Sequence, residues 1–207
     1  MYFPLFFGVV MYYEIQFFSY YIPTFTIIYA IAYFANIFQI YYLTKKLKID
    51  FNKIFNLFHL GILVSFIFAR VGGEFIFNNN FNLIEIFSYP KGENSVIGGI
   101  FGIGLVLIFF PKIFKIKASI IIKIFLPVIL LFHFLGKLAC NFAGCCYGIY
   151  TDLFFGIPSS FAIDLLDKNQ KIFPIQILES FFYLLGLILY IKIFNKYNSK
   201  KHYYLTF

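Results

Sequence analysis

Long apolar stretches, separated by short polar connections, form the main pattern of this chain. An α-helix needs about 20 mostly apolar residues to cross the hydrocarbon core of a membrane. About five stretches reach or approach this length, at residues 21–43, 54–71, 96–110, 118–140 and 174–193. The pattern predicts an all-α fold, a polytopic integral membrane helical bundle of about five transmembrane helices in a single transmembrane domain over residues 1–207.

The third stretch is short for a span, and it is rich in glycine: Gly98, Gly99, Gly102 and Gly104. Small residues let helix backbones approach closely within a membrane. We therefore expect this segment to pack tightly against a neighbouring helix. The apolar residues 1–13 are too few to span comfortably, and we interpret them as an interfacial segment on the outer surface.

Composition supports the membrane class, because 61% of the 207 residues are hydrophobic and only 13% are charged. One soluble domain of this size cannot bury so large an apolar fraction. The net charge of +8 would suggest nucleic acid binding in a soluble protein. Here the charge follows the predicted membrane connections instead, so we expect no nucleic acid partner.

Lysines are concentrated in alternate connections and in the C-terminal tail: Lys45, Lys46, Lys48 and Lys53; Lys112, Lys115 and Lys117; Lys192, Lys196, Lys200 and Lys201. The intervening connections, at about 72–94 and 147–173, carry acidic residues. The positive-inside rule then places the N-terminus outside and the C-terminus in the cytoplasm, as an odd number of spans requires. The expected location is the bacterial cytoplasmic (inner) membrane. The second acidic connection also contains aromatic residues, and we expect an amphipathic arm there on the outer leaflet.

Ionisable residues within apolar spans are costly, so each is expected to be paired or used. Arg70, the only arginine, lies near the outer end of the second span, one helical turn before Glu74. An ion pair between the two and a role in ligand binding are both open. The planar guanidinium fork favours a phosphate ligand slightly.

The fourth span carries His133, Lys137 and Asn141 one turn apart, on one face of the predicted helix. Lysine at the outer end of a span is disfavoured by the positive-inside rule, which favours a function over simple snorkelling. On the fifth span, Glu179 follows Gln176 at i, i+3. A glutamate there must pair or be protonated, and Lys137 and the arginine of the second span are the candidate partners.

Cys140, Cys145 and Cys146 lack the C-x-x-C spacing of zinc and thioredoxin-like sites. We predict no metal ligands and no cofactor, and small-residue packing is favoured over a disulfide. A thiol-redox membrane protein is therefore a minor alternative. His59, in the second span, is expected to make an interhelical hydrogen bond.

Four segments occur in order along the chain: 69–72 (ARVG), 92–99 (GENSVIGG), 136–148 (GKLACNFAGCCYG) with TDLFFG at 151–156, and 173–180 (FPIQILES). They resemble G-G-R-[LI]-G, G-G-x-S-x-H-G-G, G-R-I-G-C-F-x-x-G-C-C-Y-G with T-D-L-P-W-G, and H-P-[ST]-Q-L-Y-E. These are motifs of the bacterial prolipoprotein diacylglyceryl transferase family. Members of that family move diacylglycerol from phosphatidylglycerol to the thiol of a lipoprotein-precursor cysteine.

The resemblance implies a catalytic set of Lys137, Arg70, Glu74 and Glu179. The two cations would seat the phosphate leaving group, and one of the two glutamates would serve as the base. The implied substrate-binding residues are Asn141, Gly98, Gly99, Gly144, Gly148, Gln176 and His133, the last also a weaker candidate base. The cysteines of the chain itself would not react, because the nucleophilic thiol belongs to the precursor.

The chain departs from the family motifs at important positions. Ile97 replaces the histidine before the glycine pair, Lys137 replaces the signature arginine, and Phe173 and Leu178 replace the histidine and tyrosine of the last motif. We also expect the last helix of the family to be missing. The main alternative is therefore a catalytically silent, lipid-binding relative on the same fold.

Overall fold

The structure, a computed structural model, describes residues 14–17, 20–77, 95–159 and 170–203. The predicted interfacial segment at residues 1–13 lies outside these ranges. In the two predicted outer connections, residues 78–94 and 160–169 also lie outside them, and with the second range part of the predicted amphipathic arm.

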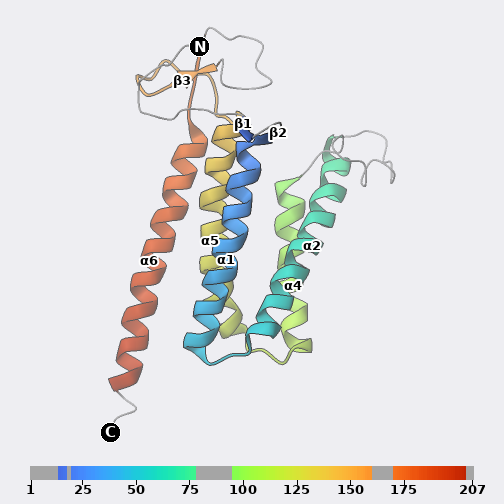
Figure 1. Cartoon of the computed structure of the whole chain (residues 1–207), viewed down its shortest axis with the longest axis vertical. Coiled ribbons are helices and arrows are strands. Elements are labelled where there is room, and N and C mark those ends of the chain that lie inside the picture. Colours follow the sequence, from blue (N-terminus) through green and yellow to red (C-terminus); the bar gives the residue numbers. More distant parts are fainter. Residues whose placement is uncertain (1–13, 18–19, 78–94, 160–169, 204–207) are drawn as a thin grey trace. The chain divides into compact units, whose positions relative to one another are not determined.

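Five long helices occur in the described part of the chain (Figure 1). They are α1 (Thr24–Leu47), α2 (Phe51–Phe77), α4 (Val96–Ile113), α5 (Ala118–Ala143) and α6 (Ile175–Tyr203). Each contains a segment of 18 to 26 residues that is long and apolar enough to cross a membrane. The predicted polytopic, all-α fold with about five spans is thus confirmed.

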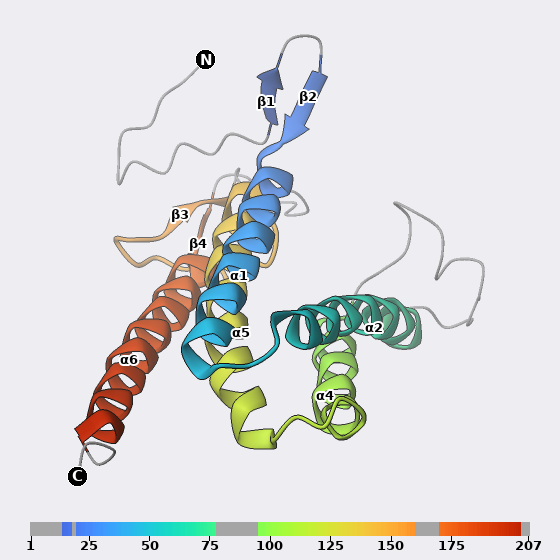
Figure 2. The same ribbon diagram turned by 60° about the horizontal axis from the view of Figure 1, so that its bottom comes forward.

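Two helix boundaries differ from the predicted spans. The first helix begins at Thr24 rather than near residue 21, because the strand β2 (Tyr20–Pro23) pairs antiparallel with β1 (Glu14–Phe17) (Figure 2). The second helix continues through residues 72–77, which were expected in a connection. Its backbone passes Gly72 without a break, and a Cβ atom added there would lie 3.2 Å from the Cα atom of Gly98 on α4. Close helix packing therefore retains this glycine inside a helix.

The chain forms two compact units, of which the first comprises residues 1–38 and 127–207 and the second residues 39–126. In the second unit, α2 and α4 pack with their backbones nearly in contact. A Cβ atom added to Gly102 would lie 2.8 Å from the carbonyl oxygen of Val64, and the hydroxyl of Ser65 donates to the carbonyl oxygen of Gly99 at 2.9 Å. The predicted glycine packing is confirmed here. It does not extend to Gly104, where an added Cβ atom would have no neighbour within 4 Å among the residues that the structure describes.

In the first unit, α5 contacts both α1 and α6 (Figures 1 and 2). The rings of Tyr29 on α1 and Phe132 on α5 have centroids 5.8 Å apart. On the α6 side, a Cβ atom added to Gly186 would lie 3.3 Å from Leu130. These contacts pack α5 against α1 and α6 within the first unit.

The connection from α5 to α6 is fastened by a small sheet. Strand β3 (Ile157–Pro158) pairs antiparallel with β4 (Lys171–Ile172), and the N–H of Gly148 donates to the carbonyl oxygen of Phe173 at 3.1 Å. A Cβ atom added to Gly148 would lie 2.6 Å from that oxygen, so only glycine permits the approach.

Large apolar side chains remain exposed along the helices. Phe34 and Phe38 on α1 are 67% and 71% exposed, and Ile97 on α4 is 74% exposed. Extended apolar surfaces of this kind are typical of contact with lipid rather than with water.

Candidate functional site

The turn that ends α5 follows from Gly144. Its φ angle of 67° is in the left-handed region, which glycine adopts without strain. The N–H of Gly144 donates to the carbonyl oxygen of Asn141 at 3.3 Å, and the N–H of Cys145 donates to that of Cys140 at 3.2 Å. This pair of hydrogen bonds is the Schellman motif, which caps the helix and places Cys145 beside Cys140. Gly144 thus has a conformational role, and its predicted contact with substrate stays a prediction.

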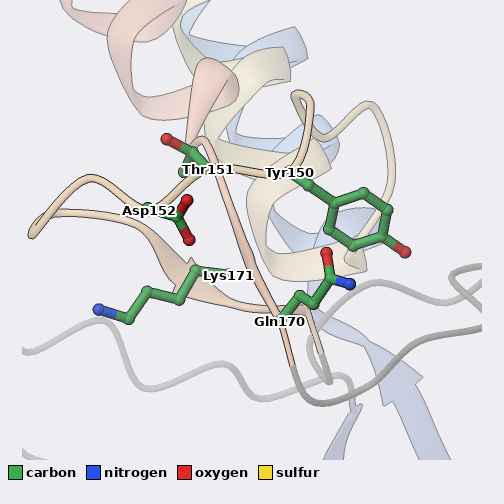
Figure 3. A pocket seen from close by; sticks show the side chains of 5 residues that line it. All are labelled: Tyr150, Thr151, Asp152, Gln170 and Lys171. Carbon is green, nitrogen blue, oxygen red and sulfur yellow. The ribbon is translucent and has the colours of Figure 1, made fainter.

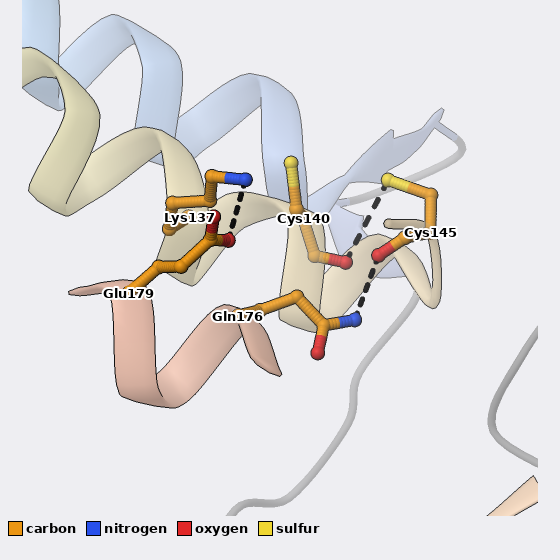
Figure 4. A network of polar contacts seen from close by, with 5 residues as sticks. All are labelled: Lys137, Cys140, Cys145, Gln176 and Glu179. Carbon is orange, nitrogen blue, oxygen red and sulfur yellow. Dashed lines mark hydrogen bonds and ion pairs between the residues drawn. The ribbon is translucent and has the colours of Figure 1, made fainter. Parts of the chain in front are cut away.

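An ion pair joins α5 to α6 beside this turn. Lys137 Nζ lies 2.6 Å from Glu179 Oε2 (Figure 4). Of the two cations expected as partners of Glu179, the structure therefore pairs it with Lys137. The two side chains are 25% and 36% exposed, so an incoming ligand can reach both.

A side chain from the first turn of α6 makes a hydrogen bond to the Schellman motif at the end of α5. Gln176, one turn before Glu179, donates from Nε2 to the carbonyl oxygen of Cys145 at 2.7 Å (Figure 4). The carbonyl oxygen of the same amide, Gln176 Oε1, is buried and has no hydrogen-bond partner in the described part of the chain. The glutamine thus fixes the turn and leaves one acceptor unused.

Asn141 on α5 has a similar unused acceptor. The residue is 2% exposed, and its Oδ1 atom has no hydrogen-bond partner among the described residues. Buried polar atoms without partners cost roughly 1–3 kcal/mol each, and they are typical of sites that bind a ligand or water.

His133 completes the predicted face of α5. Its ring stacks on that of Tyr183 of α6, with centroids 5.0 Å apart and an angle of 19° between the planes. It lies one turn before Lys137, as the sequence spacing predicts. The packing against Tyr183 fixes the orientation of the imidazole within the first unit.

Arg70 and Glu74 belong to the second unit, where both are buried on α2, with exposed fractions of 4% and 1%. Arg70 Nε and Nη1 and Glu74 Oε1 have no hydrogen-bond partner in the described ranges. No ion pair between the two residues occurs there either, so the simple i, i+4 pair is not observed. The guanidinium carbon lies 5.6 Å from the centroid of the Phe66 ring. A buried guanidinium with unused donors is suited to an anionic ligand, whereas the sharing of one phosphate by Arg70 and Lys137 stays a prediction.

The predicted glycine pair, Gly98 and Gly99, lies in the first turn of α4. Ser95 caps this helix by accepting a hydrogen bond from the N–H of Gly98 at 3.2 Å, and its own N–H donates to the carbonyl oxygen of Ala69 at 2.8 Å. An added Cβ atom at Gly98 would collide with the carbonyl oxygen of Phe68. The pair therefore has a packing role, and substrate contact at Gly98 and Gly99 is untested.

His59 was expected to bond between helices. Its Nδ1 atom lies 2.8 Å from the carbonyl oxygen of Phe55, one turn earlier on α2 itself. This contact is within one helix, and the interhelical hydrogen bond stays a prediction.

A pocket that the sequence did not predict lies in the connection between α5 and α6. It has a volume of about 380 Å³ and is lined by Tyr150, Thr151, Asp152, Gln170 and Lys171 (Figure 3). None of the predicted site residues lines it. Its lining is polar, and it lies beyond the apolar segments.

Three thiols meet at the Schellman turn. The sulfur atoms of Cys140, Cys145 and Cys146 all lie within 4.8 Å of one another. Hydrogen bonds from the thiols of Cys140 and Cys145 lower the pKa of the Cys146 thiol, and the charge of Lys137 acts in the same direction. The sequence spacing did not reveal this cluster, because the proximity depends on the left-handed turn at Gly144. A glycine placed four residues after a cysteine near a helix end was the signal available.

Comparison with known proteins agrees with the motifs. The sequence model of the family described as "Prolipoprotein diacylglyceryl transferase" matches residues 13–207. Two similar proteins, from the Welgevonden and Gardel strains of Ehrlichia ruminantium, are both named phosphatidylglycerol–prolipoprotein diacylglyceryl transferase. Each is 29% identical to this chain over 172 residues, covering 79% of this chain and 63% of the relative. The chain thus spans less than two thirds of the length of these curated relatives.

Proposed function

Because the chain belongs to the prolipoprotein diacylglyceryl transferase family, we propose that it transfers the diacylglyceryl group of phosphatidylglycerol to the thiol of a lipoprotein-precursor cysteine. The reaction takes place at the outer leaflet of the bacterial inner membrane. Its partners are an anionic phospholipid and a precursor whose cysteine lies close to the membrane.

The observation that carries this proposal is the Lys137–Glu179 ion pair beside the buried acceptors of Asn141 and Gln176, which have no hydrogen-bond partner among the described residues. The pair is partly exposed, and it lies at the end of a helix with an apolar surface. A phospholipid needs such a combination, since its phosphate requires a cation and its acyl chains require an apolar surface. The free glycerol hydroxyls of phosphatidylglycerol match the two amide acceptors.

The proposed chemistry assigns one role to each side chain. The precursor sulfur forms a bond to the glycerol carbon that carries the phosphate, the carbon–oxygen bond breaks, and glycerol phosphate leaves with the electron pair. Lys137 stabilises the negative charge on the leaving phosphate. Glu179 holds Lys137 in place and is the proposed acceptor of the thiol proton. Arg70, buried and with donors that have no partner in the described part of the chain, is the second proposed phosphate ligand, and Glu74 one turn later on α2 is the alternative base.

A transfer assay tests the proposal. The purified chain is incorporated in vesicles that contain phosphatidylglycerol and is supplied with a precursor peptide bearing one membrane-proximal cysteine. The mass gain of the peptide and the release of glycerol phosphate are both measured. Stoichiometric gain and release support the transferase. Binding of phosphatidylglycerol with neither product contradicts it and indicates the silent, lipid-binding relative.

Lys137 variants give the sharper prediction. Lys137→Gln should weaken phosphatidylglycerol binding by about 1.5–3 kcal/mol, the scale of a charge-assisted hydrogen bond, and should abolish transfer. Lys137→Arg should preserve or raise both, because the guanidinium fork fits phosphate and restores the residue of the family motif. Lys192→Gln, at an exposed position farther along α6, is the matched control. Unchanged binding in Lys137→Gln would show that Lys137 is only a surface anchor.

A further inference from the structure

The three cysteines at the end of α5 bring their thiols together in one cluster. Their sulfur atoms lie within 4.8 Å of one another, yet they come from a helix and from the turn after it. Two thiolates bound to the same zinc ion lie about 3.8 Å apart, given Zn–S bonds of about 2.3 Å in a tetrahedral arrangement. The observed separations exceed this by at most about 1 Å, which side-chain rotation can supply.

The backbone around the thiols is held in place before any ligand arrives. The two hydrogen bonds of the Schellman motif fix Cys145 over Cys140, and the left-handed φ angle of 57° at Cys146 directs the third residue. From α6, Gln176 holds the carbonyl oxygen of Cys145 (Figure 4). Contacts of this kind around the ligating groups orient metal sites and raise their affinity.

Exposure indicates how such a site would be used. Cys140 and Cys145 are half-buried, whereas Cys146 is exposed. Three protein ligands with one side open to solvent are typical of catalytic rather than structural zinc sites, which are closed by four. Soft thiolate ligands select zinc-class ions over magnesium and calcium.

We propose that Cys140, Cys145 and Cys146 bind one zinc-class divalent ion. If the proposed function holds, the open fourth position takes the thiol of the lipoprotein precursor. A thiol that coordinates such an ion loses its proton, which passes to Glu179, the acceptor proposed above, and the resulting thiolate is the nucleophile that the transfer requires.

This role fits the departures of the chain from its family. The motif positions at which the family has histidine hold Ile97 and Phe173 here. A metal-bound thiolate needs no imidazole to receive its proton at the moment of attack. The sulfur then forms its bond to the glycerol carbon and leaves the metal as a thioether, while glycerol phosphate departs with the electron pair of the broken bond. Lys137 lies three residues before Cys140 on α5, where side chains are neighbours on the helix surface, so the leaving phosphate and the ion would share one neighbourhood.

Metal binding is tested without reference to activity. The full-length chain, purified in detergent under reducing conditions, is treated with a chelator and titrated with Co²⁺ or Zn²⁺. We expect one ion per chain, with the near-ultraviolet charge-transfer absorption of thiolate-bound Co²⁺. The single changes Cys140→Ser, Cys145→Ser and Cys146→Ser should each weaken binding more than about tenfold. Asp152→Asn, at an exposed carboxylate of the same connection, should leave it unchanged.

The titration of the unsubstituted chain decides the proposal even if a serine variant fails to fold. Absence of the charge-transfer absorption, or binding that survives all three serine changes, would overturn it. Loss of two thiols to a disulfide that excludes the metal would overturn it as well.

The transfer assay then separates the metal role from the proposed function. Transfer that is lost on chelation, restored by Zn²⁺ and absent in Cys145→Ser supports the fourth-ligand role. Transfer that persists in the metal-free protein overturns that role and leaves the transferase intact. Absence of transfer in protein loaded with one ion per chain overturns the transferase and leaves the metal site standing.

Discussion

At the scale of single residues, the ion pair of Lys137 and Glu179 joins two helices where an unpaired charge is costly. Charges inside apolar stretches are conspicuous in a sequence, so both residues could be predicted as site candidates. The choice of partner could not be predicted, because Arg70 and Lys137 were equally suitable for Glu179. The thiol cluster was missed for a similar reason, since it depends on the backbone conformation at Gly144.

A double-mutant cycle tests this pair as a stabilising contact. Lys137→Gln and Glu179→Gln should each lower the free energy of unfolding, because each leaves an uncompensated charge between α5 and α6. The double change should cost less than the sum of the two, with a coupling of about 0.5–3 kcal/mol. Unfolding in mixed detergent micelles, followed by circular dichroism, measures all four proteins. Strictly additive losses would show that the pair contributes no coupling.

At the scale of elements, the glycines of the short third span could be predicted to pack against another helix. Which of these glycines pack closely could not be predicted, because that depends on the rotation of α4 about its axis relative to α2. Gly102 faces the backbone of Val64 closely, whereas Gly104 faces open space. The start of α1 could not be predicted either, since residues 20–23 are apolar enough for a span but pair with β1 instead.

The two glycines form a matched pair for experiment. Gly102→Ala should destabilise the α2–α4 packing by about 1–3 kcal/mol, because its Cβ atom would meet backbone atoms that cannot yield easily. Gly104→Ala should be neutral or stabilise the helix by up to about 1 kcal/mol. The midpoints of detergent-induced unfolding compare them. Equal effects of the two changes would contradict the tight α2–α4 contact.

At the scale of the whole molecule, the number of spans could be predicted because hydropathy alone determines it. Orientation in the membrane is a separate prediction, based on the distribution of lysines. It matters for the proposed function, because a site at the end of α5 would meet secreted precursors only if that end faces outward.

Labelling with a membrane-impermeant thiol reagent measures the orientation. In a variant whose native cysteines are replaced by serine, Asp152→Cys should react in intact cells. Lys115→Cys should react only after the membrane is permeabilised. Both residues lie in connections between helices, so local access is comparable. The reverse pattern would place the site in the cytoplasm.

The pairing of Gly148 with Phe173 has a consequence for how this sequence could diverge. Phe173 enters that contact through its main chain: its carbonyl oxygen accepts from Gly148, and its N–H donates to the carbonyl oxygen of Ile149 at 2.9 Å. Its side chain makes an edge contact with the ring of Phe155, with centroids 5.6 Å apart. The backbone of Phe173 is therefore fixed by hydrogen bonds, whereas its side chain can be replaced. A substitution at this position can change the chemical groups of the connection without disrupting its fold. The free energy of unfolding of Phe173→His should stay within about 1 kcal/mol of that of the parent chain. Gly148→Ala should open the connection and make it sensitive to limited proteolysis.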